Sequence, residues 1–343
     1  MENCLLVRTM DYFEDDLYDV LVTGKHQALK EYLDKGLDVN HAFRSTDRPD
    51  RLGKTLLEIG VQEQQKDIIE ELISKKANAN LKYIVDVNNY AYTLREYKKK
   101  DCLKLTCLYT CIVKNQVEMI KLLVQGGYNV NNYDDRGCTC LWHAVDLNNY
   151  DMVKAILLAK DCDVNVMDTA LLRPLHIAAM HGNHKIMSLL IRRGARIDAV
   201  QLRGWTALNL SCRTGCVPTT RMLLLNGADP NHIAYNEHTP LSMSLQYCED
   251  RQIPELLLEA GAEVTKSLVK KCKEEKMVNL ILNPDLFYLM KFLSDTPRTL
   301  RTLSCLRIRK SLLKSSSDLH IIQKVEGLPL PRLIKEYLLM AHL

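Results

Sequence analysis

Cysteine and histidine are the side chains of this sequence best suited to binding a metal or carrying out nucleophilic chemistry. Two groups of potential zinc ligands occur: Cys138 with Cys140, and Cys212 with Cys216 and His232. Neither group has the second ligand pair at the spacing that a zinc finger needs. We therefore predict no metal site, and we interpret these cysteines as small, reduced and mostly buried residues.

The sequence also lacks the motifs of the common enzyme classes. Gly24-Lys25 is not preceded by the glycine-rich run of a Walker A loop, and no G-x-S-x-G elbow or Rossmann glycine set occurs. His176, His181 and His184 lie close together in the sequence, but histidine at the first of these positions has a structural explanation given below. We predict a protein that is not an enzyme and needs no cofactor.

The charge and the N-terminal residues limit the compartment and the class of partner. The formal net charge is +4 over 343 residues, which is too small to imply nucleic-acid binding by itself. Residues 1–16 lack the basic and apolar regions of a signal peptide, and no apolar run is long enough to span a membrane. We expect a cytoplasmic or nuclear protein that binds neither nucleic acid nor a membrane.

A segment near the C-terminus has the composition of a protein-binding element. It carries Leu300, Leu303, Leu306 and Ile308, together with six arginines and lysines and no acidic residue between them. An apolar stripe with a basic back is typical of a segment that binds a partner or a membrane surface. It is also compatible with packing on the preceding domain, and the residues alone leave both interpretations open.

The rest of the chain consists of elements that position such a segment. Residues 173–198 predict two short helices: Pro174 fits a first helical position, Gly182-Asn183 ends the first helix, and Gly194 ends the second. A pair of helices this short cannot bury its own apolar face, so it needs neighbours of the same kind.

Repeats of this pair follow one another along the chain. The last four steps between the residues that close each unit are 34, 33, 33 and 34 residues long. A leucine stands eight places before the closing residue in six of seven units, and only Tyr32 breaks the series. The closing residues are Asn40, Asn80, Asn131, Asn165, Asp198, Asn231 and Thr265, and the leucines are Leu72, Leu123, Leu157, Leu190, Leu223 and Leu257.

The unit resembles the ankyrin repeat, whose T-P-L-H-x-A signature occurs here as Arg173-Pro174-Leu175-His176-Ile177-Ala178. The resemblance implies an all-α solenoid, a capping threonine where this unit has Arg173, and a histidine that hydrogen-bonds the turns. We predict a lead-in over residues 1–14, about seven repeats over 15–265 and capping or linker helices over 266–298. Steps that are too long place insertions near 43–52 and 81–104. The second insertion is rich in tyrosine and lysine, and suits a recognition surface or a solvated spacer equally well.

The tail over 299–339 resembles a SOCS box, which implies a fold of three helices. Part of the first segment is similar to an elongin-binding motif, with Ser304 at the usual cysteine position and Cys305 beside it. The matched residues are Thr299, Leu300, Leu303, Ser304, Cys305 and Ile308 for elongin, and Leu328, Pro329, Leu330 and Pro331 for the cullin-selecting L-P-x-P motif.

Together these features resemble the family of ankyrin-repeat and SOCS-box proteins. The resemblance implies a substrate-recognition subunit of a ubiquitin ligase that binds elongin C with elongin B, and then cullin-5 with its RING partner. Target ubiquitination and degradation would be carried out by those partners. The alternative is an ankyrin scaffold that tethers proteins without ubiquitin chemistry, in which the tail caps the solenoid.

The substrate is a protein that the sequence does not name. Its contacts are expected on turn tips and on exposed positions of the first helix of each repeat. We predict that Trp205 is exposed beside Arg203 as an anchor of this surface; the alternative is that the ring packs down on a neighbouring turn. The candidates are Tyr133, Arg136, Asp146, His181, Leu202, Arg203, Trp205, Arg213, Tyr235 and Tyr247.

Overall fold

The computed structural model divides the chain into two compact units, residues 1–163 and 164–343. The boundary falls inside the predicted repeat domain. The predicted SOCS box with its elongin- and cullin-binding residues lies outside the residues that the structure describes. These residues are 13–43, 53–79, 83–85, 103–105, 107–134, 136–235, 237–274, 277, 280 and 283–295.

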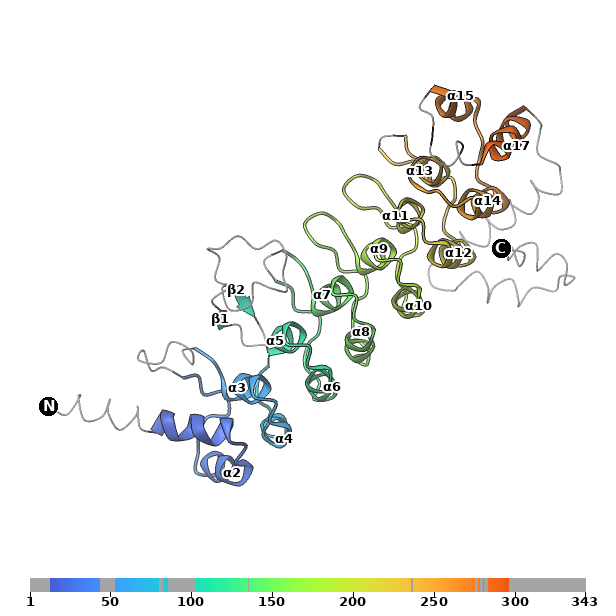
Figure 1. Ribbon diagram of the computed structural model, residues 1–343. Helices are drawn as coiled ribbons and strands as arrows, with labels where there is room; N and C mark the ends of the chain where they lie inside the picture. The colour runs from blue at the N-terminus through green and yellow to red at the C-terminus, as the bar shows by residue number, and fades with distance from the viewer. Residues whose placement is uncertain are drawn as a thin grey trace, which may run out of the picture. The chain divides into compact units, whose positions relative to one another are not determined.

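The first unit consists of paired short helices, as the ankyrin resemblance implies (Figure 1). Its first helix covers 13–22 and therefore begins inside the predicted lead-in. The helices that follow are α2 (His26–Asp34), α3 (Leu56–Gln62), α4 (Lys66–Ser74), α5 (Cys107–Val113), α6 (Val117–Gln125), α7 (Cys140–Asp146) and α8 (Tyr150–Ile156).

A short β-ribbon in the first unit adds to the predicted all-α fold. Strand β1 (Tyr83–Val85) pairs antiparallel with β2 (Leu103–Leu105), and Ile84 lies opposite Lys104. The two strands bracket most of the predicted insertion over 81–104, whose other residues lie outside the described ones. Both strands contain β-branched, aromatic or leucine residues and no glycine or proline, which is compatible with strand pairing.

The second unit continues the same pattern and confirms the predicted helical solenoid class. Each pair is again a first helix preceded by a turn and a second helix that begins within a few residues (Figure 1). The helices are α9 (Pro174–Met180), α10 (His184–Arg192), α11 (Ala207–Thr214), α12 (Val217–Leu225), α13 (Pro240–Tyr247), α14 (Gln252–Glu259), α15 (Lys266–Glu274) and α17 (Pro284–Asp295).

Threonine caps begin most of the first helices of the repeats. The hydroxyl of Thr139 accepts a hydrogen bond from the backbone N–H three residues further on, and Thr55, Thr206 and Thr239 do the same. Arg173 has no side-chain oxygen to take this role. The helix that follows it starts instead with a proline at its first position.

The leucine that recurs in the sequence is the centre of the core in each repeat. All six of these leucines are buried in the structure, five of them completely. Burying a leucine side chain contributes about 1.5–3 kcal/mol to folding, so this position is a main source of each repeat's stability.

The closing residue links its repeat to the next one. The side-chain oxygen of Asn131 accepts from the backbone N–H of Asp163 at 2.8 Å, and its nitrogen donates to the carbonyl of Asp161 at 2.8 Å. Asn165 and Asn231 each make the same pair of bonds to the repeat that follows. The period of about 33 residues is therefore the distance between one link and the next.

The cysteines of the described part of the chain are all free thiols, and seven of the nine are buried. Burial is the main cause that raises the pKa of the Cys107, Cys140 and Cys212 thiols. These thiols are protonated at neutral pH and act as small core side chains, as the sequence suggests. Among the described residues, no helix has both the length and the apolar character that a bilayer-spanning segment requires.

Candidate protein-binding surface

Four turns of one shape precede α7, α9, α11 and α13. In each turn the backbone N–H of the first residue donates to the carbonyl of the fifth, at 3.0 to 3.1 Å. The fourth residue always has a positive φ. The turns cover residues 134–138, 168–172, 201–205 and 234–238, and the positive-φ residues are Gly137, Leu171, Gly204 and Glu237.

In the second unit, backbone hydrogen bonds join the turn over 201–205 to the turn before it and the turn over 234–238 to the turn over 201–205. The N–H of Leu202 donates to the carbonyl of Ala170 at 3.1 Å, and the N–H of Tyr235 donates to the carbonyl of Arg203 at 3.4 Å. The imidazole Nε2 of His232 lies 2.8 Å from the carbonyl oxygen of Gly204. These bonds hold the three turns side by side and fix the spacing between the residues at their tips.

Trp205 does not have the exposure that we predicted. Trp205 is only 9% exposed, so the prediction of an exposed ring is wrong. The guanidinium carbons of Arg203 and Arg213 lie 5.7 and 5.2 Å from the ring centroid. The two cations cover the ring from the turn and from the end of α11, and they gain cation–π attraction there.

The side chains that remain accessible around Trp205 are aromatic, aliphatic and basic. Tyr235 is 76% exposed and Leu202 is 61% exposed. A Cβ at position 204 would lie 3.0 Å from the ring of Tyr235, so Gly204 is what allows this ring to approach the turn. We call the set Leu202, Arg203, Trp205, Arg213 and Tyr235 the turn surface.

The other predicted substrate-binding residues lie outside the turn surface. Tyr133, Arg136 and Asp146 belong to the first unit, where Tyr133 and Asp146 are exposed. His181 and Tyr247 are exposed at the ends of α9 and α13 in the second unit. Ile233, 66% exposed, was missed by the sequence reasoning. Ile233 lies two positions after the closing residue Asn231, between α12 and α13. An apolar residue at this position between two helices is the signal that could have identified it.

The structure also brings together Asp134, Cys138 and His143, whose ligand atoms all lie within 4.8 Å of one another. One Asp134 oxygen is 3.0 Å from the His143 Nε2, and the other accepts from the backbone N–H groups of Arg136 and Cys138. Burial raises the pKa of the Asp134 carboxyl, but these hydrogen bonds outweigh burial and hold it below its ordinary value. The carboxylate therefore stabilises the turn over residues 134–138.

His176 has the structural role that the ankyrin resemblance implies. Its Nδ1 accepts from the N–H of Arg173 at 3.0 Å, and its Nε2 lies 2.8 Å from the carbonyl oxygen of Ala199. The side chain is buried, and this burial is the main cause that lowers its pKa to about 4. The neutral ring thus joins the turn before α9 to the loop that follows α10.

Acidification is therefore expected to destabilise the protein in part through His176. The folded state takes up this proton only near pH 4, whereas the unfolded chain does so near pH 6.5, so stability falls as the pH drops between these values. The loss at pH 5 amounts to about 2 kcal/mol. Urea unfolding of the parent and of His176→Gln at pH 7 and pH 5 measures it. An equal pH dependence in both proteins would contradict the assignment.

Positive charge is concentrated near the turn surface in the sequence. Residues 169–228 contain eight arginines and lysines and a single acidic residue, Asp198. The whole chain has a net charge of only +4, so this stretch of the second unit is far more basic than the average of the chain. Such a surface favours partners that carry negative charge.

Several known proteins are similar to part of this chain. The nuclear factor NF-kappa-B p105 subunit of Gallus gallus is 24% identical over 56% of this chain and 19% of its own length. The B-cell lymphoma 3 protein homolog of Mus musculus is 28% identical over 43% of this chain and 34% of its own length. The ankyrin repeat and KH domain-containing protein mask-1 of Caenorhabditis elegans is 30% identical over 40% of this chain and 5% of its own length. The chain thus matches about a third or less of each relative.

Two family matches divide the chain into its functional parts. The sequence model of ankyrin repeats matches residues 84–168 and 175–267, which together are more than half of the chain. The SOCS-box model matches residues 296–339, directly after the helices that end the described part. Both are domains of non-catalytic adaptors that bind other proteins. Ankyrin repeats followed by a SOCS box place this chain in the family of ankyrin-repeat and SOCS-box proteins.

Proposed function

We propose that this protein is the substrate-recognition subunit of a ubiquitin ligase built on elongin B, elongin C and cullin-5 with its RING partner. The observation that carries the proposal is the SOCS-box match over 296–339, which contains Leu328-Pro329-Leu330-Pro331. Prolines restrict the backbone before a partner arrives, which lowers the ordering cost of binding. The ligase would act in the cytoplasm or the nucleus.

The turn surface is the proposed contact with the substrate. Tyr235 and Leu202 offer accessible apolar area, and Arg203 and Arg213 present positive charge beside it. Tyrosine, arginine and tryptophan are the residues that most often dominate binding energy in interfaces. A protein segment with carboxylates next to apolar side chains complements this arrangement best.

Co-purification tests the ligase half of the proposal. The intact chain is expected to bring down elongin B and elongin C from cells, and a chain ending at Asp295 is not. Retention of both elongins by the shortened chain would leave the scaffold alternative as the better explanation. The shortened chain also collects substrates, because it binds them without handing them to the ligase.

Tyr235→Ala tests the substrate half. The side chain is 76% exposed, so the free energy of unfolding is expected to change by about 0.5 kcal/mol or less. Binding to a substrate trapped by the shortened chain should weaken by about 2 kcal/mol, as expected for a hot spot. Tyr288→Ala is the matched control, since Tyr288 is 70% exposed on α17, outside the turn surface. Equal effects of the two changes on binding would contradict the assignment.

A further inference from the structure

A second surface lies between α10 and α12, the second helices of two consecutive repeats. These helices pack less closely against each other than the first helices α9 and α11 do, and they leave a groove of about 560 Å³. The apolar side of the groove is formed by Ile191, Val217, Met222 and Leu225. It is formed by residues distinct from the turn surface, which the turns and the end of α11 provide.

The apolar side chains of α12 exceed what its own packing requires. Leu223 and Leu224 are fully buried and supply the contact with the rest of the repeat. Met222 and Leu225 remain partly exposed and line the groove instead. A helix of this kind needs one apolar side, so the second apolar side is available for a partner.

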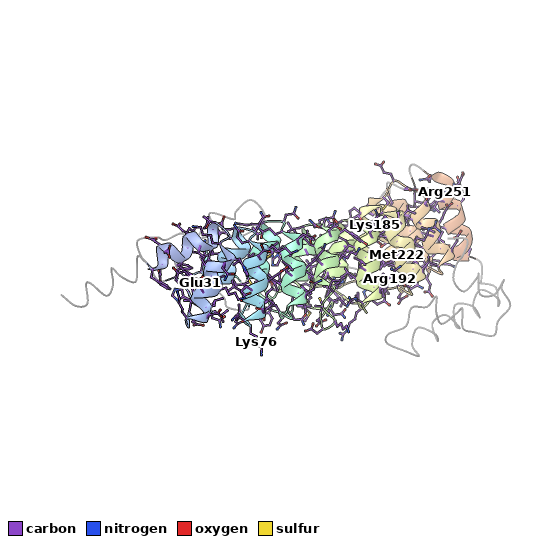
Figure 2. All side chains as sticks on the ribbon, turned by 90° about the horizontal axis from the view of Figure 1, so that it is seen from below. Glu31, Lys76, Lys185, Arg192, Met222 and Arg251 are labelled. Atoms are coloured by element: carbon purple, nitrogen blue, oxygen red, sulfur yellow. The ribbon has the colours of Figure 1, made fainter. Side chains whose placement is uncertain are left out.

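The rim of the groove is basic. Arg192 of α10 and Arg221 of α12 line it, and Lys185 is exposed on α10; Figure 2 labels Lys185, Arg192 and Met222 in this region. Neither helix contains an acidic residue, and within the part of the chain that the structure describes, neither Arg192 nor Arg221 forms an ion pair. Two arginines at the edge of an apolar groove are thus available to carboxylates.

We propose that this groove binds an acidic, amphipathic peptide segment of a partner protein. Leucine-like side chains of the segment fill the apolar side of the groove, and its carboxylates pair with Arg192 and Arg221. A groove of this volume is in the range that holds a few side chains. A nucleic acid would use the arginines and leave the apolar side unfilled, and a membrane surface is too flat to fill a recessed groove. The inference is independent of the proposed ligase.

Binding of a synthetic peptide to the full chain tests the proposal. The probe is a fluorescein-labelled helical peptide with leucines at helical spacing and glutamates at most other positions, measured by fluorescence anisotropy. Two control peptides replace all glutamates by glutamine or all leucines by serine. We expect each control to bind about tenfold more weakly than the probe, because carboxylates and leucines both contribute.

Variants of the chain locate the binding site. Arg192→Glu combined with Arg221→Glu should weaken probe binding by about tenfold or more, and Met222→Ser by about fivefold. Lys154→Glu, a single charge reversal at an exposed position of α8, should alter binding by about twofold or less. Circular dichroism verifies that each variant is folded. If the double arginine variant does not fold, the Met222 variant still tests the site, because it leaves the charges unchanged.

Three results would overturn the proposal. The first is equal binding of the probe and of either control peptide. The second is unchanged binding by both the double arginine variant and the Met222 variant. The third is tighter binding of a single-stranded oligonucleotide, or of vesicles with anionic lipid, that depends on the same arginines, since either would identify a different class of partner.

Discussion

Replacing Trp205 by alanine is expected to lower the free energy of unfolding by about 3–5 kcal/mol, the usual cost of truncating a buried aromatic side chain. Trp205 is buried, and both Arg203 and Arg213 pack on its ring. Its loss would remove the support of the turn that precedes α11. Urea unfolding followed by circular dichroism measures the change.

Trp205→Phe is the matched control for this prediction. Among the residues that the structure describes, the buried Nε1 of Trp205 has no hydrogen-bond partner. Phenylalanine therefore keeps most of the ring contacts and removes this unsatisfied donor. We expect a loss of about 1.5 kcal/mol or less, as for other apolar replacements of similar size. A protein with alanine at this position that is as stable as the parent, yet fails to bind substrate, would restore the original prediction of an exposed anchor.

Leu300→Ala is expected to abolish co-purification of the elongins while the repeats stay folded. The family resemblance places Leu300 at the start of the elongin-binding motif, in a hydrophobic pocket of elongin C. Truncating a buried leucine costs about 2–5 kcal/mol, which lowers affinity by a factor of at least about thirty. Affinity capture followed by immunoblotting for elongin C gives the result, and an undiminished signal would refute the role of this residue.

A second pair of changes separates the two halves of the tail. Pro329→Ala together with Pro331→Ala should weaken cullin-5 binding more than elongin binding, because the family resemblance assigns these prolines to the cullin-selecting motif. If both partners are lost to the same extent, the tail has unfolded and the two motifs do not act separately. Leu300→Ala is expected to act first on elongin binding, so the two variants serve as controls for each other.

Much of the fold was predictable because the same pattern recurs in each repeat, so that each structural position occurs several times in the sequence. The step of about 33 residues located the helices and turns, and the leucine eight places before the closing residue identified the core. The structure explains the closing asparagines such as Asn131, whose two bonds to the next repeat require both an oxygen and a nitrogen. A pattern with such a local cause can be recognised in a single sequence.

The features that were missed depend on contacts between residues far apart in the pattern. Trp205 is covered in part by Arg213, which lies eight residues later on α11, and nothing in the turn sequence requires this. The pairing of Tyr83–Val85 with Leu103–Leu105 joins the two ends of an insertion that has no repeat to interpret it. The groove between α10 and α12 arises only when two repeats are placed side by side.

The hydrogen bonds that join Leu202 to Ala170 and Tyr235 to Arg203 have a kinetic consequence for whatever protein binds the turn surface. Because the turns are already held together, a partner needs to order little of this surface on arrival. Electrostatic attraction to the basic stretch would then set a fast association rate that differs little between substrates. In the proposed ligase, different substrates should accordingly be distinguished by how long they stay bound, and this residence time would be the interval available for their modification.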